Sequence, residues 1–194
     1  MALRQIVYLP DPVLRRKAKP VTKFDKELQT LIDDMIDTMR EAPGVGLAAP
    51  QVGISQQLAV IEYAEDDEEE ELAEDVETPH EPKPKKLFVI INPEIIKVSD
   101  EKVMGIEGCL SIPNLHGEVE RHHAIQVKAL NRHGKPVKIK VDGWMARIFQ
   151  HEIDHLNGVL YIDKLTDESN FWTEQAYYER FEESGEEPEE TAFA

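Results

Sequence analysis

Two histidines and a glutamate in the second half of the chain have the types and spacing of a hydrolytic metal centre. His151, Glu152 and His155 form the pattern H-E-x-x-H. Side chains four residues apart lie on one face of a helix, so both imidazoles can bind one metal ion. The glutamate can then act as the general base toward a water molecule. Core histidines held only by hydrogen bonds would produce the same pattern. A third ligand is therefore needed to distinguish a metal site from such a pair.

Two residues are candidates for the third ligand. The longer zinc-protease pattern has a histidine three residues after Gly158, where this chain has Tyr161. Glu174, further downstream, is one candidate. Cys109, the only cysteine, is the other, because a thiolate and two imidazoles leave the fourth tetrahedral position for water. A lone cysteine is also a common small core residue, so Cys109 by itself leaves both ligand sets open.

The motif is expected to lie on a helix that packs against a core. A helix is predicted over 143–157, and the two histidines and Glu152 fall on its apolar side. Arg147, Gln150 and Asp154 form the side predicted to be polar. A carboxyl group among apolar side chains tends toward a raised pKa, as a base near neutral pH requires, although a nearby dication opposes that shift.

The rest of the chain mixes helices and strands. Apolar residues at helical spacing predict an amphipathic helix over 25–41, and a glycine-rich loop follows over 44–53. Strands are predicted over 58–61 and 87–91, a hairpin over 119–130 and 137–141, and a last helix over 168–182. The predicted helices and strands do not alternate as in repeated β-α-β units. This order favours an α+β fold with mixed or antiparallel sheets packed around the helix that carries H-E-x-x-H.

Acidic residues are concentrated in two segments. The formal net charge is −17, and twelve acidic residues lie in 62–81 and six in 182–190, with no lysine or arginine in either segment. The rest of the chain has 21 acidic and 22 basic residues. We therefore expect a catalytic domain over 1–166 with an acidic, flexible insertion over 62–86, and a C-terminal helix and acidic tail over 167–194.

Composition excludes several classes of protein. The 194 residues suffice for one domain with a substantial core. An acidic chain is unsuited to non-specific nucleic-acid binding, and no apolar run reaches the roughly 18 residues of a membrane span. The single cysteine excludes an intrachain disulfide, and the first residues lack a secretory signal. A cytoplasmic location without direct nucleic-acid binding or membrane contact is therefore expected.

Three segments, in their order along the chain, resemble the signature motifs of the peptide deformylase family. They are Gly44-x-Gly46-x-Ala48-Ala49-x-Gln51, Glu107-Gly108-Cys109-Leu110-Ser111 and Gln150-His151-Glu152-x-Asp154-His155-Leu156-x-Gly158. The opening Pro10-Asp11-Pro12-x-Leu14-Arg15 is also similar to the start of that family. The resemblance covers roughly residues 5–165 and implies removal of the formyl group from the N-terminal formyl-methionine of new polypeptides.

The resemblance implies a metal and a catalytic base. Cys109, His151 and His155 would bind the metal, which is Fe²⁺ in the family, with Zn²⁺, Ni²⁺ or Co²⁺ as substitutes. Glu152 would take the proton of the attacking water and deliver it to the departing amine. The partners would be formyl-methionyl nascent peptides, with transient proximity to the ribosome.

The resemblance also implies groups that hold the substrate. The oxyanion would accept hydrogen bonds from the side-chain amide of Gln51 and the backbone N–H of Leu110. The peptide would bind as an extended strand, with its methionine in an apolar pocket. The residues expected next to the peptide are Val45, Gly46, Gly108 and Ile148. The acidic insertion and the acidic C-terminal segment depart from the family, in which a basic C-terminal helix docks some members on the ribosome.

Two other functions compete with deformylation. An H-E-x-x-H zinc endopeptidase would use a downstream glutamate, for which Glu174 is a candidate, as its third ligand and would leave Gln51 and the segment 107–111 without a role. A non-catalytic metal-binding or interaction module would use its acidic segments to bind basic partners. The three motifs together favour deformylation over both.

Overall fold

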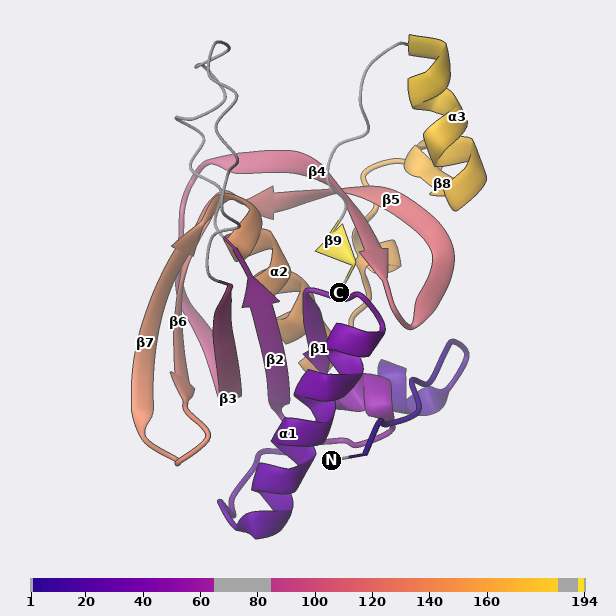
Figure 1. Cartoon of the computed structure of the whole chain (residues 1–194). Coiled ribbons are helices and arrows are strands. Elements are labelled where there is room, and N and C mark those ends of the chain that lie inside the picture. Colours follow the sequence, from indigo (N-terminus) through magenta and orange to yellow (C-terminus); the bar gives the residue numbers. More distant parts are fainter. Residues whose placement is uncertain (1, 65–84, 185–191, 194) are drawn as a thin grey trace, which may run out of the picture.

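The computed structural model describes residues 2–64, 85–184 and 192–193. These residues form two sheets and three α-helices (Figure 1). The helices are α1 (Lys26–Glu41), α2 (Gly143–Leu156) and α3 (Glu174–Ser184). The larger sheet contains, in spatial order, β1 (Gly46–Ala48), β2 (Leu58–Tyr63), β3 (Lys86–Val98), β6 (Ala124–Leu130) and β7 (Pro136–Asp142). The smaller sheet contains β8 (Phe171–Thr173), β5 (Ile112–His122), β4 (Lys102–Cys109) and β9 (Ala192–Phe193).

The larger sheet is covered on both faces where β1 and β2 lie. Alternation along β2 directs Val60 toward the apolar cluster under α1 and directs Ala59 and Ile61 toward the cluster under α2. Figure 1 shows α1 in front of these strands and α2 behind them. Helix α2 also contacts β5 of the smaller sheet. The helix that carries the H-E-x-x-H sequence is therefore enclosed between the two sheets.

Helix α1 agrees with the prediction for 25–41. The carboxylate of Asp25 caps its first turn by accepting a hydrogen bond from the backbone N–H of Leu28 (3.1 Å). Its buried residues recur at helical spacing and pack against β1 and β2. The helix ends before Pro43, which cannot continue the hydrogen-bond ladder of a helix.

Several strands differ in extent from the prediction. The strand predicted over 87–91 continues to Val98, with two irregularities in its pairing to β6. The segment predicted as one strand over 119–130 is divided at His123 between β5 and β6, and only β6 pairs with β7. Strand β4, which ends at Cys109, was not predicted, because its two glycines obscure the alternation of a strand.

The helix predicted over 168–182 begins later than expected. Residues 168–170 form a 3-10 turn and 171–173 form β8, so α3 starts at Glu174. Strand β8 pairs antiparallel with β5, opposite Leu115 and Gly117. This long-range pairing outweighs the helical pattern of the local sequence.

The acidic segments fall mostly outside the described residues. The predicted insertion over 62–86 includes Glu62 and Tyr63 of β2 and Lys86 of β3, and those strands pair antiparallel up to Tyr63 and Lys86. Residues 65–84 and 185–191 lie outside the described ranges. No helix in the described ranges combines the length and apolar character needed to cross a membrane.

Candidate active site

Cys109, His151 and His155 lie together between the two sheets. Cys109 ends β4, and the two histidines lie on one face of α2. One candidate ligand atom from each residue lies within 4.8 Å of those of the other two. The Sγ atom of Cys109 is 3.2 Å from Nε2 of His155. All three side chains are buried, so the group has the composition and spacing of a three-residue metal site.

The polar atoms at this site suit a metal ion and a water molecule. Within the described residues, Nε2 of His151 and both carboxylate oxygens of Glu152 have no hydrogen-bond partner, although all are buried. Buried polar atoms in folded proteins are nearly always paired. Nδ1 of His151 is already bonded to Glu107 (2.9 Å), which leaves Nε2 for a metal. The donor set of one thiolate and two imidazoles therefore fits a divalent transition metal.

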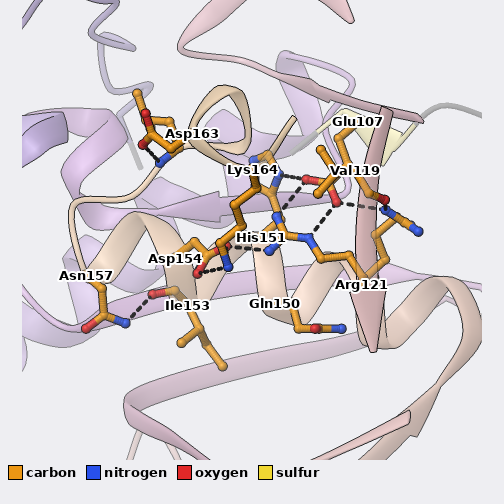
Figure 2. A network of polar contacts seen from close by, with 12 residues as sticks. Glu107, Val119, Arg121, Gln150, His151, Ile153, Asp154, Asn157, Asp163 and Lys164 are labelled. Carbon is orange, nitrogen blue, oxygen red and sulfur yellow. Dashed lines mark hydrogen bonds and ion pairs between the residues drawn. The ribbon is translucent and has the colours of Figure 1, made fainter. Parts of the chain in front are cut away.

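Glu107 organises a buried polar network behind His151 (Figure 2). Its carboxylate accepts two hydrogen bonds from Arg121 (2.8 and 2.9 Å) and one from Arg147 (3.0 Å). Burial alone would raise the pKa of Glu107, but hydrogen bonds from Arg121 and His151 outweigh burial and hold that pKa below its ordinary value. The ionised carboxylate orients the imidazole of His151 and favours the tautomer with its proton on Nδ1.

The side of α2 predicted to be polar does carry the polar residues Arg147, Gln150 and Asp154, but it is largely buried. Arg147 donates to the carbonyls of Val119 (2.8 Å) and Val103 (2.9 Å), and Gln150 exchanges hydrogen bonds with the backbone of His122. Both side chains are buried because the smaller sheet covers this side of the helix. Asp154 is partly buried and pairs with Arg121 and Lys164.

Glu152 is buried next to the candidate ligands. Burial, followed by the negative charge of Glu107, raises the pKa of Glu152 well above its ordinary value. The absence of a side chain at Gly46 makes room for Glu152. A Cβ atom at Gly46 would lie 2.9 Å from Cδ of Glu152, which is closer than real contacts allow. Strand β1 and the carboxylate are therefore in direct contact.

Gln51 points toward Cys109. Its Oε1 accepts a hydrogen bond from the backbone N–H of Ala48 (2.7 Å), and its Nε2 lies 3.6 Å from Sγ of Cys109. The first bond fixes the orientation of the amide, so the donor side faces the candidate ligands. Leu110 directly follows Cys109, and its side chain packs closely against Gly44.

The residues expected to contact a peptide lie in different surroundings. Gly46 belongs to β1, an edge strand of the larger sheet, and Val45 precedes it. Gly108 pairs in parallel with Phe193 of β9, so the chain itself occupies this edge of β4. Ile148 is fully buried in the core cluster against which Val45 packs.

Glu174 is not part of the candidate metal group. Within the described chain that group contains Cys109, His151 and His155. Glu174 instead contributes to a cavity of about 450 Å³ that also reaches Cys109 and Leu110.

The sequence patterns indicate no role for Glu107 or Arg121 next to His151. Glu107 lies two residues before Cys109, and this closeness in sequence is the feature that could have indicated a role near the candidate ligands. Arg121 is one arginine on a strand, and nothing in its local sequence indicates that it is buried against Glu107.

Comparison with known proteins identifies the family. The family model of polypeptide deformylase matches residues 3–171. A peptide deformylase from Symbiobacterium thermophilum is 49% identical over 166 residues, which are 86% of this chain and 68% of that protein. One from Halothermothrix orenii is 47% identical over 165 residues, covering 85% of this chain and 95% of that protein. The crystal structure of peptide deformylase from Thermotoga maritima matches with a TM-score of 0.73 at 43% identity, over 86% of this chain and 100% of that one. The chain therefore belongs to the polypeptide deformylase family.

Proposed function

We propose that this chain hydrolyses the formyl group from the N-terminal formyl-methionine of newly made polypeptides with the help of one divalent metal ion. The observation that carries the proposal is the buried group of Cys109, His151 and His155, with the unpartnered carboxylate of Glu152 beside it. Deformylation of such peptides is the general function of the family to which the chain belongs.

Cys109, His151 and His155 would hold the metal. By resemblance to the family we expect Fe²⁺, with Zn²⁺, Ni²⁺ or Co²⁺ as substitutes. When bound, the metal supplies Lewis acidity, which lowers the pKa of a water molecule and polarises the formyl group. Glu107 keeps the imidazole of His151 in place through its bond to Nδ1.

Glu152 would move the proton in both halves of the reaction. Its carboxylate takes a proton from the attacking water and then delivers it to the amine that leaves. Burial favours return of the proton because it raises the pKa of the carboxyl group, and a bound dication would oppose that shift. The small residue Gly46 keeps that carboxylate free to face the substrate.

Gln51 and Leu110 would stabilise the oxyanion. The Nε2 donor of Gln51 already faces Cys109, because its Oε1 is held by the backbone N–H of Ala48. The backbone N–H of Leu110 would be the second donor. Each fixed donor of this kind contributes roughly 3–4 kcal/mol to lowering the barrier.

The peptide would add an extended strand to the edge of β1 that faces away from β2, next to Val45 and Gly46. A peptide that also bonds to Gly108 would have to take the place of β9 on β4. The methionine side chain would reach the apolar cluster that contains Ile148 and borders Val45. We also propose that residues 1–166 form the catalytic domain. The protein would act in the cytoplasm, in transient proximity to the ribosome.

The position of Glu174 does not support the endopeptidase hypothesis. That hypothesis needs a downstream glutamate such as Glu174 as a ligand, and the candidate ligand group within the described residues is completed by Cys109 instead. The interaction-module hypothesis gives no role to the buried carboxylate of Glu152.

Formate release from formyl-Met-Ala-Ala by anaerobically prepared, iron-loaded protein tests the proposal. Mass spectrometry of the product should show an intact peptide with a free amino terminus. Acetyl-Met-Ala-Ala is the matched control for non-specific hydrolysis. Cleavage of the peptide bond without formate would favour an endopeptidase, and no reaction by folded, metal-loaded protein would overturn the proposal.

A further inference from the structure

A cavity continues from the candidate active site along the turn between β4 and β5. Its volume is about 450 Å³, and Cys109 and Leu110 belong to its lining. Pro43, which follows α1, and the residues after Cys109 supply most of the remaining surface, which is largely apolar. Because Cys109 belongs to the candidate metal group, a peptide held there can extend into this cavity.

Glu174 is the one charged residue in the described lining of this cavity. The rest of that lining consists of apolar residues, Tyr8 and Asn114. The negative charge of Glu174 also acts on the nearby imidazole of His116, but burial outweighs that charge and keeps the pKa of His116 below its ordinary value. A carboxylate beside apolar walls attracts a cationic group more strongly than one surrounded by water, because the walls lower the local dielectric constant.

The position of Glu174 is fixed by its neighbours. Thr173, the preceding residue, pairs with Leu115 across β8 and β5. Three residues later, the ring of Tyr177 stacks on His116 with centroids 5.0 Å apart, and both rings are buried. Helix α3 begins beyond residue 171, where the family match ends, so this carboxylate is contributed by the chain's own C-terminal segment.

We propose that Glu174 is a specificity determinant that favours peptides with lysine or arginine among the residues after formyl-methionine. The inference rests on the proposed function, which brings such peptides to Cys109. The apolar walls accommodate the methylene groups of a long basic side chain, and its charged end reaches the carboxylate. The difference in attraction between a cationic and a neutral side chain then appears as a difference in kcat/KM.

Matched peptides test this inference on the full-length, metal-loaded protein. Each is formyl-Met-Ala-Ala-Ala with lysine, norleucine or glutamate in place of one alanine, and kcat/KM is measured by formate release. We expect kcat/KM for the lysine peptide to exceed that for the norleucine peptide by about threefold at one or more positions at low salt. The preference should decrease as ionic strength rises. In Glu174→Gln the lysine-to-norleucine ratio should fall to about one, and Glu174→Lys should favour the glutamate peptide.

The ratio is measured within one protein sample, so a smaller folded fraction in a variant does not change it. Glu94→Gln is the matched control, because Glu94 is exposed on β3 and its loss removes the same charge. That variant should keep the wild-type ratio. Equal rates for lysine and norleucine at every position, or a preference that survives in Glu174→Gln, would overturn the inference while deformylation itself stands. No formate from any formyl peptide would overturn the proposed function and the inference with it.

Discussion

His151 is held from the side opposite the candidate ligand group. Its Nδ1 bonds to Glu107, whose carboxylate is in turn bonded by Arg121 and Arg147. Four buried polar groups thus satisfy one another, and removing one would leave charges unpaired in the core. The network explains how a helix between two sheets can carry charged residues on both sides.

Replacing single ligands should remove the metal. In Cys109→Ser a thiolate becomes a neutral hydroxyl, and His151→Ala or His155→Ala removes an imidazole. We expect metal content by elemental analysis to fall by more than about tenfold in each purified variant. His133→Ala is the matched control, because His133 is exposed on the β6–β7 turn. Full metal content in Cys109→Ser would mean that another residue is the third ligand.

At the scale of elements, local patterns could predict the helices that carry the site but not the contacts that bury it. The helix over 143–157 follows from apolar spacing, and α2 spans Gly143–Leu156. The burial of Arg147 could not be predicted, because its partners are carbonyls on strands more than 25 residues away. The start of α3 was missed for the same reason, since β8 depends on pairing with β5.

Strand β9 should compete with substrate. It pairs with β4 at Glu107 and Gly108, where the proposed peptide would also bond. Deletion of 185–194 is therefore expected to lower KM for short formyl-Met peptides severalfold, with little change in kcat, as steady-state kinetics can measure. A control with glutamine at the four glutamates in 186–190 removes charge but keeps 192–193, and it should retain the wild-type KM. An unchanged or higher KM after deletion would show that β9 does not compete.

Ala2 and Arg4 are hydrogen-bonded to the ionised carboxylate of Asp34 on α1. Asp34 accepts hydrogen bonds from the backbone N–H of Ala2 (2.8 Å) and from Arg4 (3.0 Å). These contacts, the bond from Ala2 foremost, lower the pKa of Asp34 below its ordinary value. A lowered carboxyl pKa stabilises the fold above the unfolded-state pKa of about 3.9, and this stabilisation is lost as pH falls through the folded-state value.

Asp34→Asn should therefore destabilise the protein at neutral pH by about 1–2 kcal/mol. The free energy of unfolding, measured in urea from pH 7 to pH 3, should differ less between wild type and variant as the pH falls below about 4. Asp100→Asn is the control, since Asp100 is exposed. A difference that stays constant with pH would show that ionisation of Asp34 is not the cause.

At the scale of the whole molecule, charge and catalysis are carried by different parts of the chain. The whole acidic excess lies in 62–81 and 182–190, and the candidate site residues lie outside both segments. The charge pattern could be predicted because it depends on composition alone. The enclosure of α2 by a second sheet could not, because that sheet is built from pairings such as Leu115 with Thr173.

The acidic insertion should be dispensable for catalysis on short peptides. Strands β2 and β3 already pair up to Tyr63 and Lys86, so a short Gly/Ser turn in place of 65–82 can connect them. Loop-closure entropy changes slowly with length, so the cost in stability should be small. We expect kcat/KM within about tenfold of wild type and lower solubility as the net charge approaches zero. A larger loss would mean that the insertion takes part in the reaction.

Glu152→Gln separates metal binding from proton transfer, because we propose that Glu152 moves the proton at a metal held by Cys109, His151 and His155. The substitution keeps size and hydrogen bonding but removes the base, and Glu152 is not needed as a ligand. Metal content and formate release should be measured on the same anaerobic preparation. We expect wild-type metal content with turnover lower by about 10²–10⁴-fold. Normal turnover with bound metal would contradict this proposal, because Glu152 would then be a structural residue.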